Sequence, residues 1–173
     1  MERRDLIRAI SAFGLATAAL ALTGCGQPSP AASNASDAGA TPVPAPTLSD
    51  AQKKTLLAEL PVAYQSADLS NGEAKFALCR SCHSVSQGGD DMTGPNLWGI
   101  FGRKAGSKTS FTYSDDLKNA GWTWDAGRIN QWITNPRAVL PGTKMTFIGL
   151  QDPNDRRDVI AFLKTQTSPA PKS

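Results

Sequence analysis

The sequence predicts an all-α domain, with about four short helices and long loops wrapped around a large central group. Three observations support this prediction. No run among the 173 residues alternates apolar and polar side chains as a half-buried strand would. Helix start signals recur from residue 49 onward. Residues 84–122 are rich in Gly, Pro, Asn, Asp and Ser, and so long a loop in a compact domain needs something large to fill its centre.

Residues 1–24 are expected to be a lipoprotein-type signal peptide. A start with three arginines leads into the apolar, small-residue run 9–23, which is too short to be a comfortable membrane span. Leu22-Thr23-Gly24-Cys25 is similar to a bacterial lipobox, in which Cys25 carries the lipid. An ordinary signal peptide with an unmodified Cys25 and an uncleaved N-terminal anchor are the alternatives. All three would export the domain to the periplasmic side of a bacterial cell envelope.

Residues 25–48 are expected to be a lipid-anchored, Pro/Ala-rich linker. They contain no aromatic side chain and almost nothing that could enter a core. Fully extended, residues 26–48 would reach about 70 Å. The linker would let the domain swing between membrane partners, and more than one acyl chain would hold it stably.

Residues 49–67 are expected to form an N-terminal extension. Ser49 and Gln52 make a capping box that starts its helix, and Pro61 ends the helix. Residues 61–67 are expected to be extended over the domain. The apolar stripe of the helix comprises Leu56, Leu57 and Leu60.

The domain proper is expected to span residues 68–166, followed by a disordered polar tail, 167–173. Its first helix would run from Ser70 to Cys79. Thr123 is a candidate cap for the next, whose inner face comprises Ile129, Trp132 and Ile133, and Asn135-Pro136 would stop it. Asp152-Pro153 would open the last helix, with proline in the first turn. Its core face comprises Val159, Ile160, Phe162 and Leu163.

The run Cys79-Arg80-Ser81-Cys82-His83 is typical of covalent haem c attachment. Both thiols would bond the haem, and His83 would be the proximal iron ligand. A thioredoxin-like redox motif would need a βαβ context, which the surrounding sequence lacks. A structural zinc site needs four ligands, but the chain has three cysteines and one histidine. A disulfide between Cys79 and Cys82 would leave His83 without a role.

The second iron ligand is expected to be Met145. His83 is the single histidine, so two-histidine ligation within one chain is excluded. Met1 would leave with the signal peptide, and Met92 follows His83 too closely to reach the opposite haem face. Met145 lies 62 residues downstream, after a Pro141-Gly142 turn that could direct its sulfur inward. The alternative is that Met145 simply fills the core.

Charge gives no reason to expect nucleic-acid binding. Removal of residues 1–24 leaves 15 of the 18 basic and 13 of the 15 acidic residues, a net charge of +2. A nucleic-acid interface would need a basic face.

Four ordered motifs, the attachment run 79–83, residues 93–106, residues 111–115 and residues 141–145, are similar to mitochondrial cytochrome c and its soluble bacterial relatives. The likeness covers about residues 70–166 and implies the cytochrome c fold with one covalent haem and its iron. It also implies that Pro95 accepts the Nδ1 proton of His83. It implies that Arg103, Tyr113 and Trp124 hydrogen-bond a buried haem propionate, and that Thr143 lies beside a propionate at the Met145 turn. The alternative for Trp124 is simple core packing.

The resemblance has two departures in the distal pocket. Trp132 stands where the family commonly has a tyrosine near the methionine sulfur, and an indole can donate but cannot accept a hydrogen bond. Leu117 stands where an asparagine usually lines the pocket. The haem edge is also less basic than in the mitochondrial protein, because Asp90 and Asp91 accompany the cations there.

These features favour a membrane-tethered one-electron carrier that is not an enzyme in the strict sense. Its expected partners are a quinol-oxidising complex as donor and a terminal oxidase or reductase as acceptor. A haem enzyme or gas-binding sensor with an open distal site is the alternative, and ligation by Met145 distinguishes the two. A donor subunit bound permanently to one enzyme is a third hypothesis.

Overall fold

The computed structural model describes residues 47–172. The expected signal peptide 1–24, the lipid site Cys25 and the linker as far as residue 46 lie outside these described residues. Within them the chain is helical, with one isolated antiparallel bridge between Lys104 and Thr123 and no strand. The all-α prediction is confirmed.

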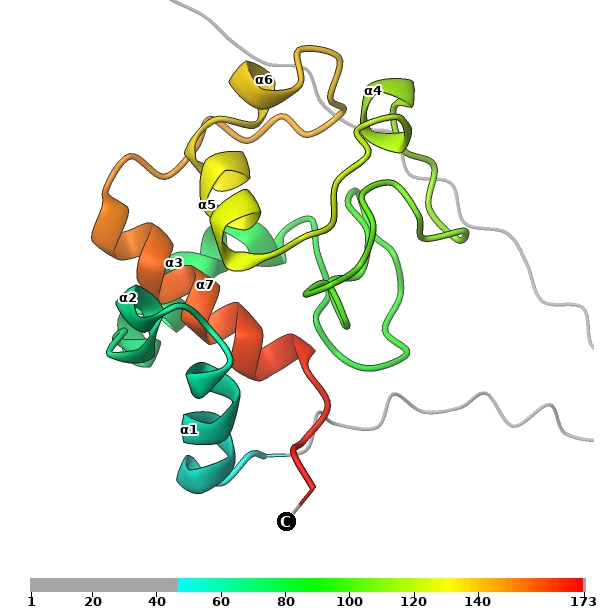
Figure 1. The fold of residues 1–173 in the computed structure, drawn as a ribbon. Coiled ribbons are helices and arrows are strands. Elements are labelled where there is room, and N and C mark those ends of the chain that lie inside the picture. Colours follow the sequence, from blue (N-terminus) through cyan, green and yellow to red (C-terminus); the bar gives the residue numbers. More distant parts are fainter. Residues whose placement is uncertain (1–46, 173) are drawn as a thin grey trace, which may run out of the picture. The chain divides into compact units, whose positions relative to one another are not determined.

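Four longer helices and three single turns make up residues 47–172 (Figure 1). The longer helices are α1 (Asp50–Ala58), α3 (Leu69–Arg80), α5 (Ala126–Thr134) and α7 (Pro153–Thr167). The single turns are α2 (Val62–Gln65), α4 (Asp115–Lys118) and α6 (Pro136–Val139). Sequence analysis anticipated the four longer helices and missed the single turns, whose few residues carry little periodic signal.

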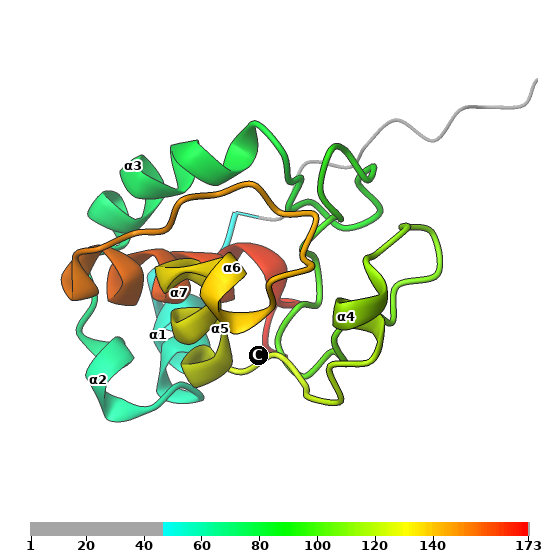
Figure 2. The ribbon, with the colours of Figure 1, turned by 90° about the horizontal axis from the view of Figure 1, so that it is seen from above.

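Helices α3 and α7 cross closely, and α7 also contacts α1, α2 and α5 (Figure 2). A Cβ atom on Gly72 would collide with the backbone of Asp158 and the Cβ of Phe162, so only glycine fits at the crossing. Beside it, the rings of Phe76 and Phe162 pack with centroids 5.5 Å apart. The predicted inner face of α7 is confirmed, because Val159, Ile160, Phe162 and Leu163 are all buried.

The start of α5 differs from the prediction. Asp125, rather than Thr123, caps this helix by accepting a hydrogen bond from the Arg128 N–H at 2.7 Å. Thr123 is instead drawn into the bridge with Lys104. The predicted inner face is confirmed, because Ile129, Trp132 and Ile133 are buried.

The N-terminal extension packs on α7 as two helices rather than one. The predicted capping box of Ser49 and Gln52 is confirmed. Residues 61–67, expected to be extended, contain the single turn α2. Leu48, placed in the linker by the sequence, is buried together with Leu56 and Leu60. The folded unit therefore begins about one residue earlier than predicted.

The C-terminal boundary also differs from the prediction. Helix α7 continues to Thr167, which is fully buried and whose carbonyl accepts a hydrogen bond from the Gly99 N–H at 2.7 Å. Ser168 is buried as well. The first residues of the predicted tail, 167 and 168, are therefore inside the domain, where the Thr167 hydroxyl donates to the Leu163 carbonyl at 2.8 Å.

Candidate functional site

An apolar cavity of about 340 Å³ lies among α3, α5, α7 and the loops between them. All nine site residues that the sequence predicted within the described range line it. They are Cys79, Cys82, His83, Pro95, Arg103, Tyr113, Trp124, Thr143 and Met145. Most of the remaining wall is aliphatic or aromatic, which suits a large, flat, apolar group.

Cys79 lies in the last turn of α3, and the chain then turns into the cavity wall. The N–H groups of Cys82 and His83 both donate to the Cys79 carbonyl, at 3.0 and 2.9 Å. Both thiols are free, so the alternative of a disulfide between them is not what the structure contains. Burial, reinforced by Cys82, raises the pKa of the Cys79 thiol to about 11. A redox-active dithiol needs the opposite shift.

Zinc is also a poor fit to this part of the chain. Within residues 47–172 no three side chains among His, Cys, Asp and Glu come together in a way that could hold a metal ion. A structural zinc site would need four such ligands.

His83 is oriented by a single strong hydrogen bond. Its Nδ1 donates to the Pro95 carbonyl at 2.7 Å, because a carbonyl oxygen can only accept. Nδ1 therefore carries the proton and Nε2 keeps its lone pair for a ligand. Burial lowers the pKa of His83, an effect that the hydrogen bond to Pro95 opposes. A Cβ on Gly94 would collide with the imidazole ring, so this position needs glycine.

Met145 follows a tight turn, and its sulfur has one protein partner. The turn is closed by hydrogen bonds from Thr143 N–H to the Leu140 carbonyl, 3.0 Å, and from Met145 N–H to the Thr143 hydroxyl, 3.2 Å. The Trp132 indole Nε1 donates to the Met145 Sδ at 3.1 Å. Met92, by contrast, is 48% exposed and is not part of the cavity wall.

Three hydrogen-bond donors meet at another part of the cavity wall. Backbone bonds from Gly102 N–H to the Trp124 carbonyl, 2.7 Å, and from Trp124 N–H to the Arg103 carbonyl, 2.9 Å, place Arg103 beside Trp124. Arg103 pairs with no carboxylate in the described residues, and burial lowers its pKa. Arg103 donates only to backbone carbonyls, and within residues 47–172 neither the Tyr113 hydroxyl nor the Trp124 Nε1 makes a hydrogen bond to another residue.

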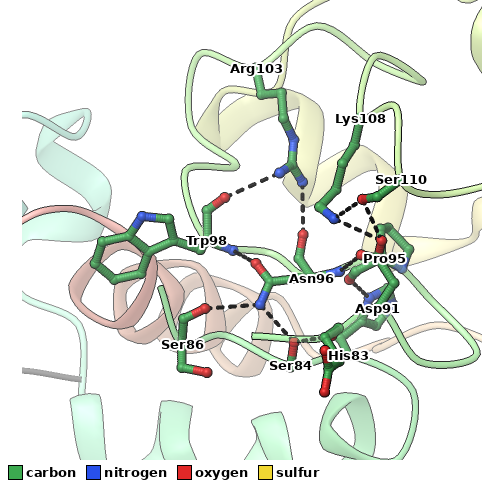
Figure 3. A network of polar contacts seen from close by, with 11 residues as sticks. His83, Ser84, Ser86, Asp91, Pro95, Asn96, Trp98, Arg103, Lys108 and Ser110 are labelled. Atoms are coloured by element: carbon green, nitrogen blue, oxygen red, sulfur yellow. Dashed lines mark hydrogen bonds and ion pairs between the residues drawn. The ribbon is translucent and has the colours of Figure 1, made fainter. Parts of the chain in front are cut away.

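The structure adds residues that sequence reasoning did not assign to the site. Leu117, noted as a departure, is buried and lines the cavity. Figure 3 shows a polar network behind His83, centred on Asn96, which is only 3% exposed. Arg103 donates to the Trp98 carbonyl at 3.1 Å and the Asn96 carbonyl at 3.2 Å, which ties the network to the cavity wall. These partners are at most 12 residues apart but lie in irregular loops, so no periodic pattern in the sequence indicates them.

Comparison with known proteins gives a consistent result. The family model described as cytochrome c matches residues 69–167. A cytochrome c2 of Rhodomicrobium vannielii is 48% identical over 104 residues, 60% of this chain and 83% of the relative. A cytochrome c2 iso-2 of Magnetospirillum molischianum is 43% identical over 96 residues, 56% of this chain and 98% of the relative. A cytochrome c of Chlamydomonas reinhardtii is 42% identical over 102 residues, 58% of this chain and 91% of the relative.

One covalently attached haem c with its iron is what this match implies, and the cavity fits such a group. The attachment run, a neutral imidazole and a thioether all line one apolar space. Arg103, Tyr113 and Trp124 provide hydrogen-bond donors on the cavity wall that have no anionic partner within the described residues. They are therefore available to bind a haem propionate, which is an anion. The predicted fold and the predicted cofactor are confirmed. With the family model covering more than half of its length, the chain belongs to the cytochrome c family.

Proposed function

We propose that this protein is a one-electron carrier whose haem iron is bound by His83 and Met145. The observation that carries the proposal is that the attachment run and Met145, 62 residues apart in sequence, line the same cavity. His83 and Met145 would hold the iron between an imidazole and a thioether, and a thioether ligand would raise its reduction potential. An iron closed in this way transfers electrons and makes or breaks no bond of a substrate.

The neighbouring residues would bind and orient the haem. Pro95 would fix the imidazole of His83 through the 2.7 Å hydrogen bond. Arg103, Tyr113 and Trp124 would bind one propionate with donors that have no anionic partner within the described residues. Thr143 would be close to a propionate at the turn before Met145. The thiols of Cys79 and Cys82 would hold the group covalently.

The carrier would be tethered to a membrane on the periplasmic side of a bacterial envelope. The support comes from the sequence: the lipobox-like run that ends at Cys25 and the Pro/Ala-rich residues 26–48. Residues 47–172 contain no helix with the length and apolarity to span a bilayer. A tether restricts the domain to nearby partners and raises its effective concentration at them.

Membrane redox complexes would be the partners, with a quinol-oxidising complex as donor and a terminal oxidase or reductase as acceptor. Electrostatic steering towards them would be weak. Lys75 is paired with Asp155 at 2.8 Å, and Arg80 with Glu73 at 3.1 Å, so two cations near the attachment run are neutralised within the protein.

Ligation by Met145 is tested by the far-red absorption of the oxidised holoprotein, where methionine sulfur on ferric haem gives a weak charge-transfer band. We expect the band in the wild type and its loss in Met145→Ala. The matched control is Met92→Ala, which removes an exposed methionine and should keep the band. A wild type that lacks the band and binds carbon monoxide readily when reduced would overturn the carrier proposal in favour of an open, ligand-binding haem.

The tether is tested separately in cells. We expect the wild type in the membrane fraction and Cys25→Ser in the soluble periplasmic fraction or retained as an unprocessed precursor. Equal membrane association of a fully processed Cys25→Ser protein would contradict lipidation without affecting the proposed iron ligands.

A further inference from the structure

The peptide group that joins Pro95 to Asn96 is hydrogen-bonded at both of its polar atoms. Its carbonyl accepts from the Nδ1 of His83 at 2.7 Å. Its N–H donates to the Oδ1 of Asp91, also at 2.7 Å (Figure 3). A carboxylate is therefore connected to the imidazole through one polarisable peptide unit.

Asp91 keeps its negative charge at neutral pH. Its second oxygen, Oδ2, accepts hydrogen bonds from Lys108 Nζ and from the Ser110 hydroxyl, both at 2.7 Å. Burial alone would raise the pKa of Asp91, but the hydrogen bonds from Lys108, Asn96 and Ser110 outweigh it and lower that pKa to about 2. The side chain is 15% exposed, so little water screens its charge.

The peptide cannot turn away from either partner, because Asn96 is fixed on every side. Its side-chain Nδ2 donates to the Ser84 hydroxyl at 2.6 Å and the Ser86 carbonyl at 2.9 Å. Its Oδ1 accepts from the Trp98 N–H at 2.8 Å, and its own carbonyl accepts from Arg103. Such a fully satisfied buried amide holds the plane of the neighbouring peptide.

Hydrogen bonds in such a chain strengthen one another, by about 10–30% per bond in condensed phases. The Asp91 carboxylate attracts the peptide proton, which increases the negative charge on the Pro95 oxygen. That oxygen then attracts the Nδ1 proton of His83 more strongly, and Nε2 becomes a better electron donor. A carboxylate bonded directly to a ligating histidine has this effect in many metal sites.

We propose that Asp91 is a positioning residue that tunes His83 through the Pro95–Asn96 peptide and thereby lowers the reduction potential of the haem. The proposal rests on the proposed role of His83 as an iron ligand. A better-donating histidine favours the oxidised iron. Lys108 partly neutralises the Asp91 carboxylate and so weakens its effect on His83. The two residues therefore change the reduction potential in opposite directions.

Two substitutions test this reasoning through the sign of their effects. Asp91→Asn keeps an oxygen that can accept from the Asn96 N–H but removes the charge, so the reduction potential should rise. Lys108→Met leaves the carboxylate less neutralised, so the potential should fall. General loosening of the loops would move the potential of both variants in the same direction, so shifts of opposite sign distinguish the proposed effect from loosening.

Matched controls remove the same charges from outside the network. Asp90→Asn alters the adjacent carboxylate, and Lys104→Met alters an exposed cation in the same loop as Lys108. We expect the Asp91→Asn shift to exceed the Asp90→Asn shift by at least a threefold change in the ferrous-to-ferric ratio, or about 28 mV for one electron. Lys104→Met should change the potential less than Lys108→Met.

The direct readout is the Nδ1 proton resonance of His83 in the reduced, diamagnetic holoprotein. A weaker hydrogen bond in Asp91→Asn should move it upfield, and Asp90→Asn should leave it in place. Equal potential shifts in the two variants, or a larger shift with an unmoved resonance, would overturn the proposal, because the charge would then act only through space. Failure of the His83 assignment itself would appear separately, as a reduced wild type in which the His83 ring protons lack the upfield ring-current shift of a haem ligand.

Discussion

With Met145 as the proposed iron ligand, the hydrogen bond from Trp132 to its sulfur should raise the reduction potential of the haem. The indole Nε1 lies 3.1 Å from Sδ, and Trp132 is 8% exposed, so water cannot replace the donor. Sulfur gives less electron density to reduced iron and is then the better hydrogen-bond acceptor. The bond therefore stabilises the reduced protein more than the oxidised one. Trp132→Phe keeps an aromatic ring beside Trp124 but removes the donor, and the potential should fall.

The size of this fall follows from the strength of one neutral hydrogen bond. A bond of this kind contributes about 0.5–1 kcal/mol, and sulfur acceptors belong at the weaker end. Because about 1.4 kcal/mol corresponds to 59 mV in a one-electron couple, the potential should fall by at most about 20–40 mV. The difference between the oxidation states is smaller than the whole bond, which makes these figures an upper bound.

A spectroelectrochemical titration measures the shift, after the far-red band has shown that Met145 is still bound. The control is Ile133→Val, which removes one methylene from the same cavity wall without touching a donor and should leave the potential unchanged. A potential in Trp132→Phe that is unchanged or higher than in the wild type would refute the reasoning. An equal fall in Ile133→Val would assign the effect to packing.

Three further predictions concern stability. Gly72→Ala should lower the free energy of unfolding by about 1–3 kcal/mol, because its Cβ collides with α7; an unchanged thermal midpoint would contradict the close crossing. Leu56→Ala should cost about 2–4 kcal/mol in guanidinium unfolding, since Leu56 is 3% exposed, whereas Val62→Ala, at a site 81% exposed, should cost almost nothing. Asp91 has a folded pKa of about 2, below its ordinary 3.8, so the folded state binds fewer protons there. Its contribution of about 2 kcal/mol should be present above about pH 4 and lost as the pH falls towards 2, and Asp91→Asn should abolish this part of the acid sensitivity.

The features predicted correctly from the sequence are those with local causes. The attachment run is contiguous, because two thiols and the following imidazole must meet one haem within a single helical turn. The capping box at Ser49 and the proline in the first turn of α7 are equally local. The family resemblance also implies that Gly72 and Phe76 let the first domain helix cross the last one closely. The structure shows why, because a Cβ at Gly72 would collide with α7 and the ring of Phe76 packs against Phe162.

The errors occur where partners distant in sequence decide the structure. Thr123 and Asp125 are both suitable N-cap residues for α5. Thr123 does not cap the helix because it forms a backbone bridge with Lys104, 19 residues away. Asp91 was interpreted only as a charge at the haem edge. No sequence pattern near it indicates that Lys108 and Ser110, 17 and 19 residues away, are its hydrogen-bond partners. Thr167 was predicted to start the tail, yet it is buried in the domain, where its carbonyl accepts a hydrogen bond from the Gly99 N–H, 68 residues earlier, at 2.7 Å.

Helix α1 makes the folded unit of this protein longer than the family match, which begins at residue 69. Glu59 meets the nearly buried Lys164 of α7 at 2.6 Å, and Leu56 and Leu60 belong to the buried interior. Cleavage near residue 68 would remove the counter-ion of the Lys164 ammonium group. It would also expose to water the apolar surface of α7 that α1 covers. Proteolytic release of a haem domain cut at the family boundary should therefore yield a species prone to self-association, and the extension belongs in any fragment meant to report the properties of the whole.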